Sequence, residues 1–349
     1  MSGKTVFVLG AGASAEAGLP VGEGLKNMIA EILDFNFHEQ APGSGDSYVF
    51  DAIHRLDAGG RSEYKSAARL IKNNMPLAGS IDNFIDAHRG NAPIEQSGKI
   101  AIAAAILKAE QNSKLYFKDQ SAWPNVISNL DKTWYLSLWK MLVSNCNVEQ
   151  ISSRLQQVAF IVFNYDRCLE HFMLNALMSY YNISVDRAIE IMSNCSIFHP
   201  YGQVGQLPYF DRKMPVNFGS DQSPNGLIQI ADSLKTFTEG TDEGSSDVIA
   251  IREAIDSSEK IVFLGFAFHD QNLDMIIPKK DRPRAFSILG SASGISLHDR
   301  ESIAWNINSR TTQQPVSLGS GLLSPTNITL DPNKAFQFIN DHSRVLTFS

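Results

Sequence analysis

Near its N-terminus the chain reads Thr5-Val6-Phe7-Val8-Leu9-Gly10-Ala11-Gly12-Ala13-Ser14-Ala15. The first half is an apolar run without polar alternation, which is typical of a strand buried on both faces of a parallel sheet. The second half has the pattern GxGxxA and leads toward a helical pattern over Gly22–Phe35. A strand, a glycine-rich turn and a helix in this order are typical of the phosphate-binding loop of a dinucleotide-binding fold.

Each small residue of this loop has an expected role. Gly10 permits the tight turn, Gly12 lets backbone N–H groups approach a pyrophosphate, and Ala15 lets helix and strand pack closely. The helix N-terminus adds a partial positive charge, and Ser14 adds a hydroxyl donor. The predicted nucleotide-binding residues of the loop are therefore Gly10, Ala11, Gly12, Ala13 and Ser14. The alternative is a purely structural tight turn.

Three later apolar runs have the same form, and helical patterns separate them. The runs are Val158–Phe163, Lys260–Leu264 and Arg284–Leu289, and the helical patterns are Cys168–Ser179, Val185–Asn194 and Asp247–Ser257. Strands that alternate with helices indicate right-handed crossovers. We therefore predict an α/β fold with a doubly wound, mostly parallel, Rossmann-like sheet.

A long helical stretch interrupts this rhythm after the first strand and helix. Its helical patterns are Ala52–Leu56, Ser62–Asn74, Ser97–Lys114 and Lys132–Ser144. We therefore predict a discontinuous core of residues 1–35 and 154–349, and a helical insertion module of residues 36–153. Gln40–Ser47 and Glu239–Ser246 are predicted loops. The tail 290–349 is predicted to hold an edge strand near Arg344–Phe348.

Composition excludes several classes of protein. The 349 residues are 43% hydrophobic and 19% charged, and the net charge of −7 argues against an obligate nucleic-acid binder. The cysteines Cys146, Cys168 and Cys195 form no CxxC pair, which excludes a zinc ribbon and predicts no metal. Three reduced thiols and no apolar run near the ~20 residues of a membrane span predict a soluble, cytoplasmic protein.

Polar residues follow several of the predicted strands at the point where each strand ends. They are Phe163-Asn164-Tyr165-Asp166-Arg167, His199-Pro200-Tyr201-Gly202 after the run Cys195–Phe198, and Gly265-Phe266-Ala267-Phe268-His269-Asp270-Gln271-Asn272. Taken singly, these are helix caps, turns or a satisfied core histidine. Parallel strands bring their carboxyl ends to one edge, where ligands of open α/β sheets bind. The shared location therefore predicts a site.

These motifs, in the same order, resemble the sirtuin-like NAD-binding superfamily, and most closely its bacterial branch found in anti-phage defence proteins. That branch has a GAGxS loop, a TNYD motif, an HG motif and a final G-[YF]-S-x-x-D-x-N pattern. The segment Ser80-Ile81-Asp82-Asn83-Phe84-Ile85 is similar to a short motif in its helical region. The resemblance covers roughly residues 4–272.

The chain departs from the family's motifs at three places, and the last of these argues against a protein deacylase. The histidine motif is His199-Pro200-Tyr201-Gly202, two residues longer than His-Gly, and Phe163 stands where the family usually has Thr. The deacylase loop GIPDFR is replaced by Gly18-Leu19-Pro20-Val21-Gly22-Glu23, so its Arg is missing. No zinc cysteines are present either.

The resemblance implies an NAD hydrolase that releases nicotinamide and ADP-ribose. Asn164 would hold the ribose hydroxyls or the attacking water, and His199 would act as general base or orient the ribose hydroxyls. Asp166 would anchor the loop, and Asp82 would face the pocket. The remaining NAD-binding residues implied are Gly265, Phe266 and Asp270, beside the loop Gly10–Ser14.

The resemblance also implies a regulated toxic effector of anti-phage defence, which depletes NAD in an abortive infection. Its control would come from a homo-oligomer or from a separate sensor protein. The rival interpretations are a non-hydrolysing sensor of NAD or ADP-ribose, a scaffold subunit and a dehydrogenase. Asp34 lies at about the distance expected of a dehydrogenase's ribose-binding acid, but it falls at a helix end instead of a second strand.

Overall fold

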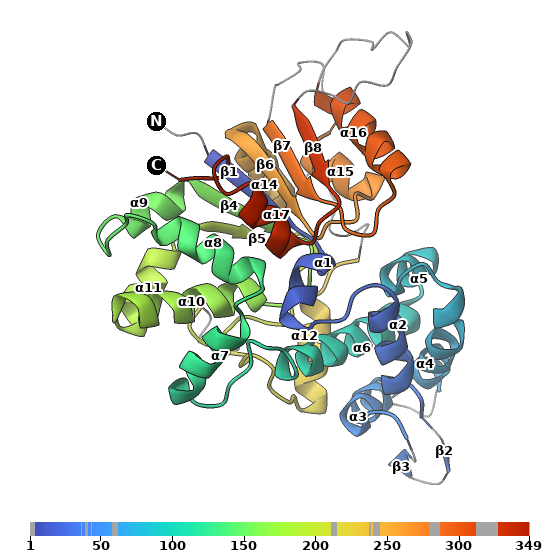
Figure 1. Ribbon diagram of the computed structural model, residues 1–349. Helices are drawn as coiled ribbons and strands as arrows, with labels where there is room; N and C mark the ends of the chain where they lie inside the picture. The colour runs from blue at the N-terminus through green and yellow to red at the C-terminus, as the bar shows by residue number, and fades with distance from the viewer. Residues whose placement is uncertain are drawn as a thin grey trace, which may run out of the picture.

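The computed structural model centres on a six-stranded, all-parallel sheet in the order β5-β4-β1-β6-β7-β8 (Figure 1). It describes residues 4–35, 37–38, 41–42, 44–57, 62–210, 215–236, 239, 245–278, 287–311 and 327–348. The strands of the sheet are β1 (Lys4–Leu9), β4 (Val158–Val162), β5 (Ser196–Phe198), β6 (Ser258–Leu264), β7 (Ser287–Ser291) and β8 (Ile328–Asp331). This order is that of a Rossmann-like fold, so the predicted fold class is confirmed.

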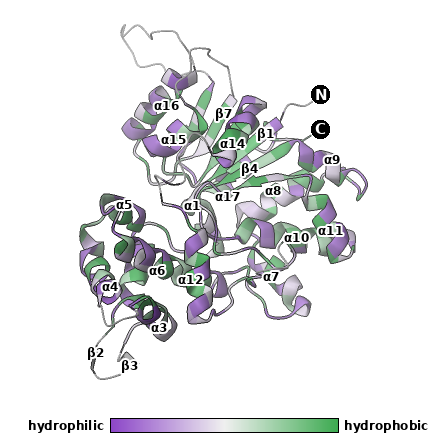
Figure 2. Ribbon diagram, turned by 180° about the vertical axis from the view of Figure 1, so that it is seen from behind, coloured by the Kyte–Doolittle hydropathy of each residue, from purple (hydrophilic) through white to green (hydrophobic). Residues whose placement is uncertain are grey.

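The sheet is buried on both faces, as its uninterrupted apolar strands predict. Val6 and Val8 of β1 pack into one hydrophobic cluster, and Phe7 and Leu9 pack into the other. Figure 2 shows the strands as the most hydrophobic part of the molecule, between helices with hydrophilic outer faces. Chain order along the sheet reverses between β1 and β6, and ligands of such sheets bind at this switch point.

Helices fill the segment between β1 and β4, together with a small two-stranded sheet of β2 (Phe37–His38) and β3 (Ala41–Pro42). The helices that follow β1 are α1 (Ala11–Ser14), the 3₁₀ turn η1 (Ala15–Ala17), α2 (Glu23–Ile32), α3 (Ser47–Leu56), α4 (Glu63–Asn74), η2 (Met75–Leu77), α5 (Ile81–Ala87), α6 (Ala92–Gln111), η3 (Gln120–Ala122), α7 (Trp123–Asn129), α8 (Trp134–Val143) and α9 (Ile151–Gln156). In Figure 1, α2 to α6 gather in one group, whereas α8 and α9 lie beside the sheet. A separate insertion module of residues 36–153 stays a prediction.

The remaining helices cover the two faces of the sheet and the outer side of α6. They are α10 (Cys168–Tyr181), α11 (Val185–Met192), α12 (Pro224–Ser233), α14 (Ser246–Asp256), α15 (Asp270–Ile276), α16 (Leu297–Thr311) and α17 (Ala335–Asp341). α12 packs against α6 and α3, which joins the second half of the chain to the helical group. None of the helices in the described part of the chain is both long and apolar enough to cross a membrane.

The sequence located the inner strands of the sheet and several of the helices, did not predict β8, and placed one strand wrongly. The predicted edge strand near Arg344–Phe348 is wrong, because the edge strands of the sheet are β5 and β8 and residues 342–348 form turns and irregular structure after α17. The apolar residues that suggested a strand are core residues instead: Leu346 and Phe348 are buried, and the Phe348 ring lies 6.4 Å from that of Phe7. Residues 284–286 of a predicted strand, and parts of both predicted loops, lie outside the described residues.

Candidate active site

The carboxyl ends of β1, β4, β5 and β6 bring the sequence motifs together at one edge of the sheet. The glycine loop follows β1, Asn164 follows β4, His199 follows β5 and Gly265 follows β6. Asn164 contacts the loop directly, and His199 contacts Asn164. The predicted convergence is therefore present in the structure.

The glycines of the loop are required by close packing against Gly265. A Cβ on Gly10 would lie 2.5 Å from the Gly265 carbonyl oxygen, and a Cβ on Gly12 would lie 2.8 Å from its Cα. The Gly12 N–H donates to that same carbonyl at 3.0 Å. The Gly12 N–H, which the sequence pattern predicts to bind a pyrophosphate, is therefore already hydrogen-bonded within the protein. The neighbouring residue Ala11 is exposed.

This packing predicts a large effect for Gly265→Ala. Gly265 has φ +56°, and its added Cβ would lie 2.1 Å from the Ala13 nitrogen, so backbone would have to move. The control Gly294→Ala has φ +81° with open space around it, so it isolates the conformational cost. We expect Gly265→Ala to lower the free energy of unfolding by about 1–3 kcal/mol more than the control, measured by urea denaturation. Equal losses would contradict the backbone contact.

Asn164 is held in one orientation by acceptors on two sides. Its Nδ2 donates to the Gly10 carbonyl at 3.0 Å and to the Ser14 hydroxyl at 2.9 Å. Because a carbonyl can only accept, this contact fixes which side-chain atom is the nitrogen. Within the described part of the chain, the other amide atom, Oδ1, takes no hydrogen bond. Asn164 therefore offers a fixed acceptor beside the loop.

Asp166 has the anchoring role that the sequence favours. Its Oδ1 accepts from the Cys168 N–H at 3.0 Å, at the start of α10, and the Ser14 hydroxyl also bonds to its carboxylate. Burial raises the pKa of Asp166, while the bonds from Ser14 and Cys168 work against that rise. Ser14 thus links Asn164 to Asp166 and ties the glycine loop to the β4–α10 turn.

His199 lies between Asn164 and Glu170. Its Nδ1 is 3.3 Å from the Asn164 carbonyl oxygen, and its Nε2 is 2.6 Å from Glu170 Oε1. Burial lowers the pKa of His199, but the adjacent Glu170 carboxylate and the Asn164 carbonyl outweigh it, so the pKa is raised overall. Because both ring nitrogens face acceptors, the geometry favours the imidazolium form, in which both nitrogens donate.

Glu170 was not among the site residues predicted from the sequence. It lies on the first turn of α10, four residues after Asp166, so that a helix starting at Cys168 carries its carboxylate back toward the same edge. The four-residue spacing between Asp166 and Glu170 is the sequence feature that could have indicated this position.

The ion pair gives stability a defined pH dependence. The pKa of His199 is raised in the folded state. The ion pair therefore stabilises the fold fully below the unfolded-state pKa of about 6.5, and this stabilisation is lost as the pH rises through the folded-state pKa. We expect the wild-type free energy of unfolding to fall over that window, and Glu170→Gln to flatten this part of the profile. Urea denaturation across pH measures it. Parallel profiles for the two proteins would contradict the pairing.

The other predicted binding residues have different surroundings. Asp82 of α5 is half-buried and accepts from the Tyr165 hydroxyl at 2.5 Å, so it reaches the residue next to Asn164. Phe266 is a core residue that packs on Phe163 with ring centroids 5.2 Å apart. Asp270 is largely exposed on α15 and pairs with Arg310 at 3.3 Å. Roles for all three in NAD binding stay predictions.

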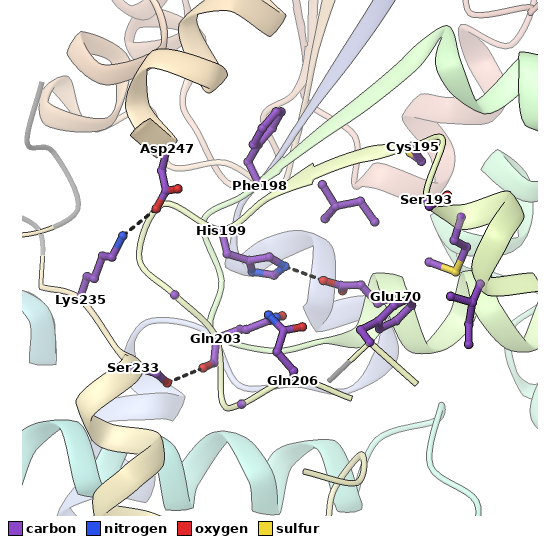
Figure 3. Close-up of a pocket in the computed structure, with 16 residues that line it drawn as sticks. Glu170, Ser193, Cys195, Phe198, His199, Gln203, Gln206, Ser233, Lys235 and Asp247 are labelled. Carbon is purple, nitrogen blue, oxygen red and sulfur yellow. Dashed lines mark hydrogen bonds and ion pairs between the residues drawn. The ribbon is translucent and has the colours of Figure 1, made fainter. Parts of the chain in front are cut away.

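A cavity of about 530 Å³ adjoins this cluster on the β5 side (Figure 3). His199 and Glu170 line it, whereas the described residues that line it do not include the glycine loop or Asn164. His199 therefore separates the Asn164 cluster from the cavity. Among the described residues, no group of three or more His, Cys, Asp or Glu side chains is placed to hold a metal ion.

Comparison with known proteins adds no assignment. No protein-family model matches the chain, and no curated protein matches it. The geometry of the site therefore carries the functional argument.

Proposed function

We propose that this protein binds NAD at the carboxyl edge of β1, β4 and β6 and hydrolyses its nicotinamide–ribose bond. The supporting observation is the fixed Asn164 amide, whose Nδ2 is bonded to Gly10 and Ser14 and whose Oδ1 is left as an acceptor beside the loop. A rigid acceptor at the end of a parallel strand, next to a phosphate-type loop, can hold a ribose hydroxyl or a water molecule.

The proposed reaction needs few protein groups. The C1′–N bond breaks, nicotinamide leaves as a neutral molecule, and positive charge develops on the ribose. The oxygen of a water molecule then bonds to C1′ and its proton passes to solvent, which gives ADP-ribose. Asn164 Oδ1 would accept a hydrogen bond from that water or from a ribose hydroxyl and so orient it.

His199 fits a positioning role better than that of a free general base. Its Nδ1 faces the Asn164 carbonyl oxygen, and its Nε2 faces Glu170. To act as a base it would first have to give up the proton that lies toward Glu170. We therefore propose that the His199–Glu170 pair holds the backbone of Asn164 in place.

A non-hydrolysing sensor of NAD or ADP-ribose is the second candidate. It is favoured by the closed state of the cluster: Ser14, Asn164 and Asp166 are 4–8% exposed, and the Gly12 N–H is taken by Gly265. A closed site also suits an enzyme that is held inactive until a partner or self-assembly opens it. Such control would protect a bacterial cell from its own NAD-depleting effector, which is the biological role we propose.

The deciding experiment measures nicotinamide release from NAD by the purified full chain, together with an NAD-dependent thermal shift. Turnover by the wild type supports the hydrolase. A thermal shift without turnover, under any oligomeric state obtained by raising the protein concentration, supports the sensor. The absence of both would contradict NAD as the ligand. A saturating ligand at 100 times its Kd adds about 2.7 kcal/mol of stability, which such a scan detects.

A further inference from the structure

The cavity beside β5 has walls that suit a small organic molecule. Its volume of about 530 Å³ lies within the range of small-molecule pockets. Its apolar lining comes from α11, β5 and the segment after β5, and consists of Ile189, Met192, Ile197, Phe198 and Phe210. It adjoins the Asn164 cluster through His199, which lines the cavity and contacts the Asn164 carbonyl oxygen.

Two buried acceptors on this lining have no partner. Glu170 Oε2 and Gln203 Oε1 make no hydrogen bond within the described part of the chain. The Glu170 side chain is 10% exposed, and its other oxygen, Oε1, is held by His199. A buried acceptor without a donor costs free energy, so such atoms mark a place that a donor occupies. Figure 3 shows the Gln203 side chain on the same side of the cavity as the His199–Glu170 pair.

The charges of the lining cancel in pairs. His199 faces Glu170 at 2.6 Å, and Lys235 pairs with Asp247 at 2.8 Å. A charged ligand would therefore find no unpaired opposite charge in the described lining. The free-energy cost of removing its charge from water would then not be offset by an ion pair. An uncharged ligand that donates hydrogen bonds would satisfy both free acceptors at no such cost.

We propose that this cavity is a binding site for an uncharged molecule with an apolar body and N–H donors, which bond to Glu170 Oε2 and Gln203 Oε1. The site rests on the geometry of the cavity alone and requires no cleavage of NAD. Because its ligand would bond to the carboxylate that holds His199, occupancy would be communicated to the Asn164 cluster through that pair.

Three probes of one shape test the proposed chemistry. Benzamide carries a ring and two N–H donors, acetophenone replaces the amide nitrogen by a methyl group, and benzoate replaces it by a charged oxygen. We expect benzamide to bind the full chain about tenfold more tightly than either of the others, measured by calorimetry or ligand-observed NMR without NAD. Equal binding of all three, or no saturation by benzamide up to about 10 mM, would overturn the proposal.

A pair of matched variants locates the site. Gln203→Leu removes one free acceptor, whereas Gln206→Leu makes the same change at an exposed residue of the same lining. We expect Gln203→Leu to weaken benzamide binding about fivefold and Gln206→Leu to leave it unchanged. Equal effects of the two variants would count against the assigned contact. Since NAD is absent, these results are independent of whether the chain hydrolyses NAD.

A readout at His199 tests the contact with Glu170. The charged groups that act on His199 are Glu170 on α10 and Asp166 on the β4–α10 turn, and the Lys235–Asp247 pair lines the same cavity. A donor on Glu170 Oε2 would weaken the hold of that carboxylate on the imidazolium. Benzamide should therefore lower the pKa of His199 in an NMR titration, and acetophenone should not. An unchanged pKa with benzamide bound would refute the Glu170 contact.

Discussion

Asn164→Ala is expected to reduce nicotinamide release from NAD by about 10²- to 10³-fold, the size of the loss when one preorganised hydrogen-bonding group of an active site is removed. The Asn164 amide is fixed by Gly10 and Ser14, so its Oδ1 needs no reorientation when it accepts from the ribose or the water. Initial rates of the purified variant and wild type measure the effect.

A second buried asparagine provides the control for this substitution. Asn175 of α10 is 3% exposed and donates to the His171 carbonyl at 2.7 Å, so Asn175→Ala removes a comparable buried amide away from the loop. We expect Asn175→Ala to lower stability but to keep the turnover of the fraction that remains folded. If both variants lost activity in proportion to their loss of stability, Asn164 would be a structural residue only.

The core of the fold could be predicted from the sequence because the inner strands are apolar on both faces. Val158–Val162 has no polar residue to interrupt the signal, and it is buried throughout. The signal fails at the β8 edge of the sheet. Ile328–Asp331 is short and half exposed, and it lacks a continuous apolar run, whereas the apolar Leu346 and Phe348 suggested a strand where the chain only turns inward.

The position of the site at the sheet edge could be predicted from the sequence, but the hydrogen bonds between its residues could not. Parallel topology alone brings Asn164, His199 and Gly265 to one edge, because each lies within two residues of the end of its strand. Which atom contacts which depends on loop conformation, and sequence spacing does not encode that. The pairing of His199 with Glu170 and the use of the Gly12 N–H by Gly265 both arise from contacts between loops of different strands.

Breaking the ion pair between Glu110 and Arg167 is expected to destabilise the protein by about 3–5 kcal/mol, because it leaves one buried charge without a partner. Both side chains are fully buried, and Arg167 Nη2 lies 2.6 Å from Glu110 Oε2. Glu110, in the last turn of α6, also accepts from the backbone N–H of Arg167 and of Gly219. Urea denaturation of Glu110→Leu and of Arg167→Met measures the loss.

The double variant Glu110→Leu/Arg167→Met distinguishes the energy of the ion pair from the energy of each side chain's other contacts. If the cost of each single substitution is mainly the stranded charge, the double variant is no less stable than either single one, with a coupling energy of about 2 kcal/mol or more. Strictly additive losses would show that the backbone contacts of each side chain carry the effect instead. The exposed pair Arg187–Glu190 is the control, and Glu190→Ala there should leave the unfolding midpoint unchanged.

Because Arg167 follows Asn164 by three residues, the Glu110–Arg167 pair joins the β4–α10 turn to α6. Loss of the pair should therefore also reduce any NAD-dependent thermal shift.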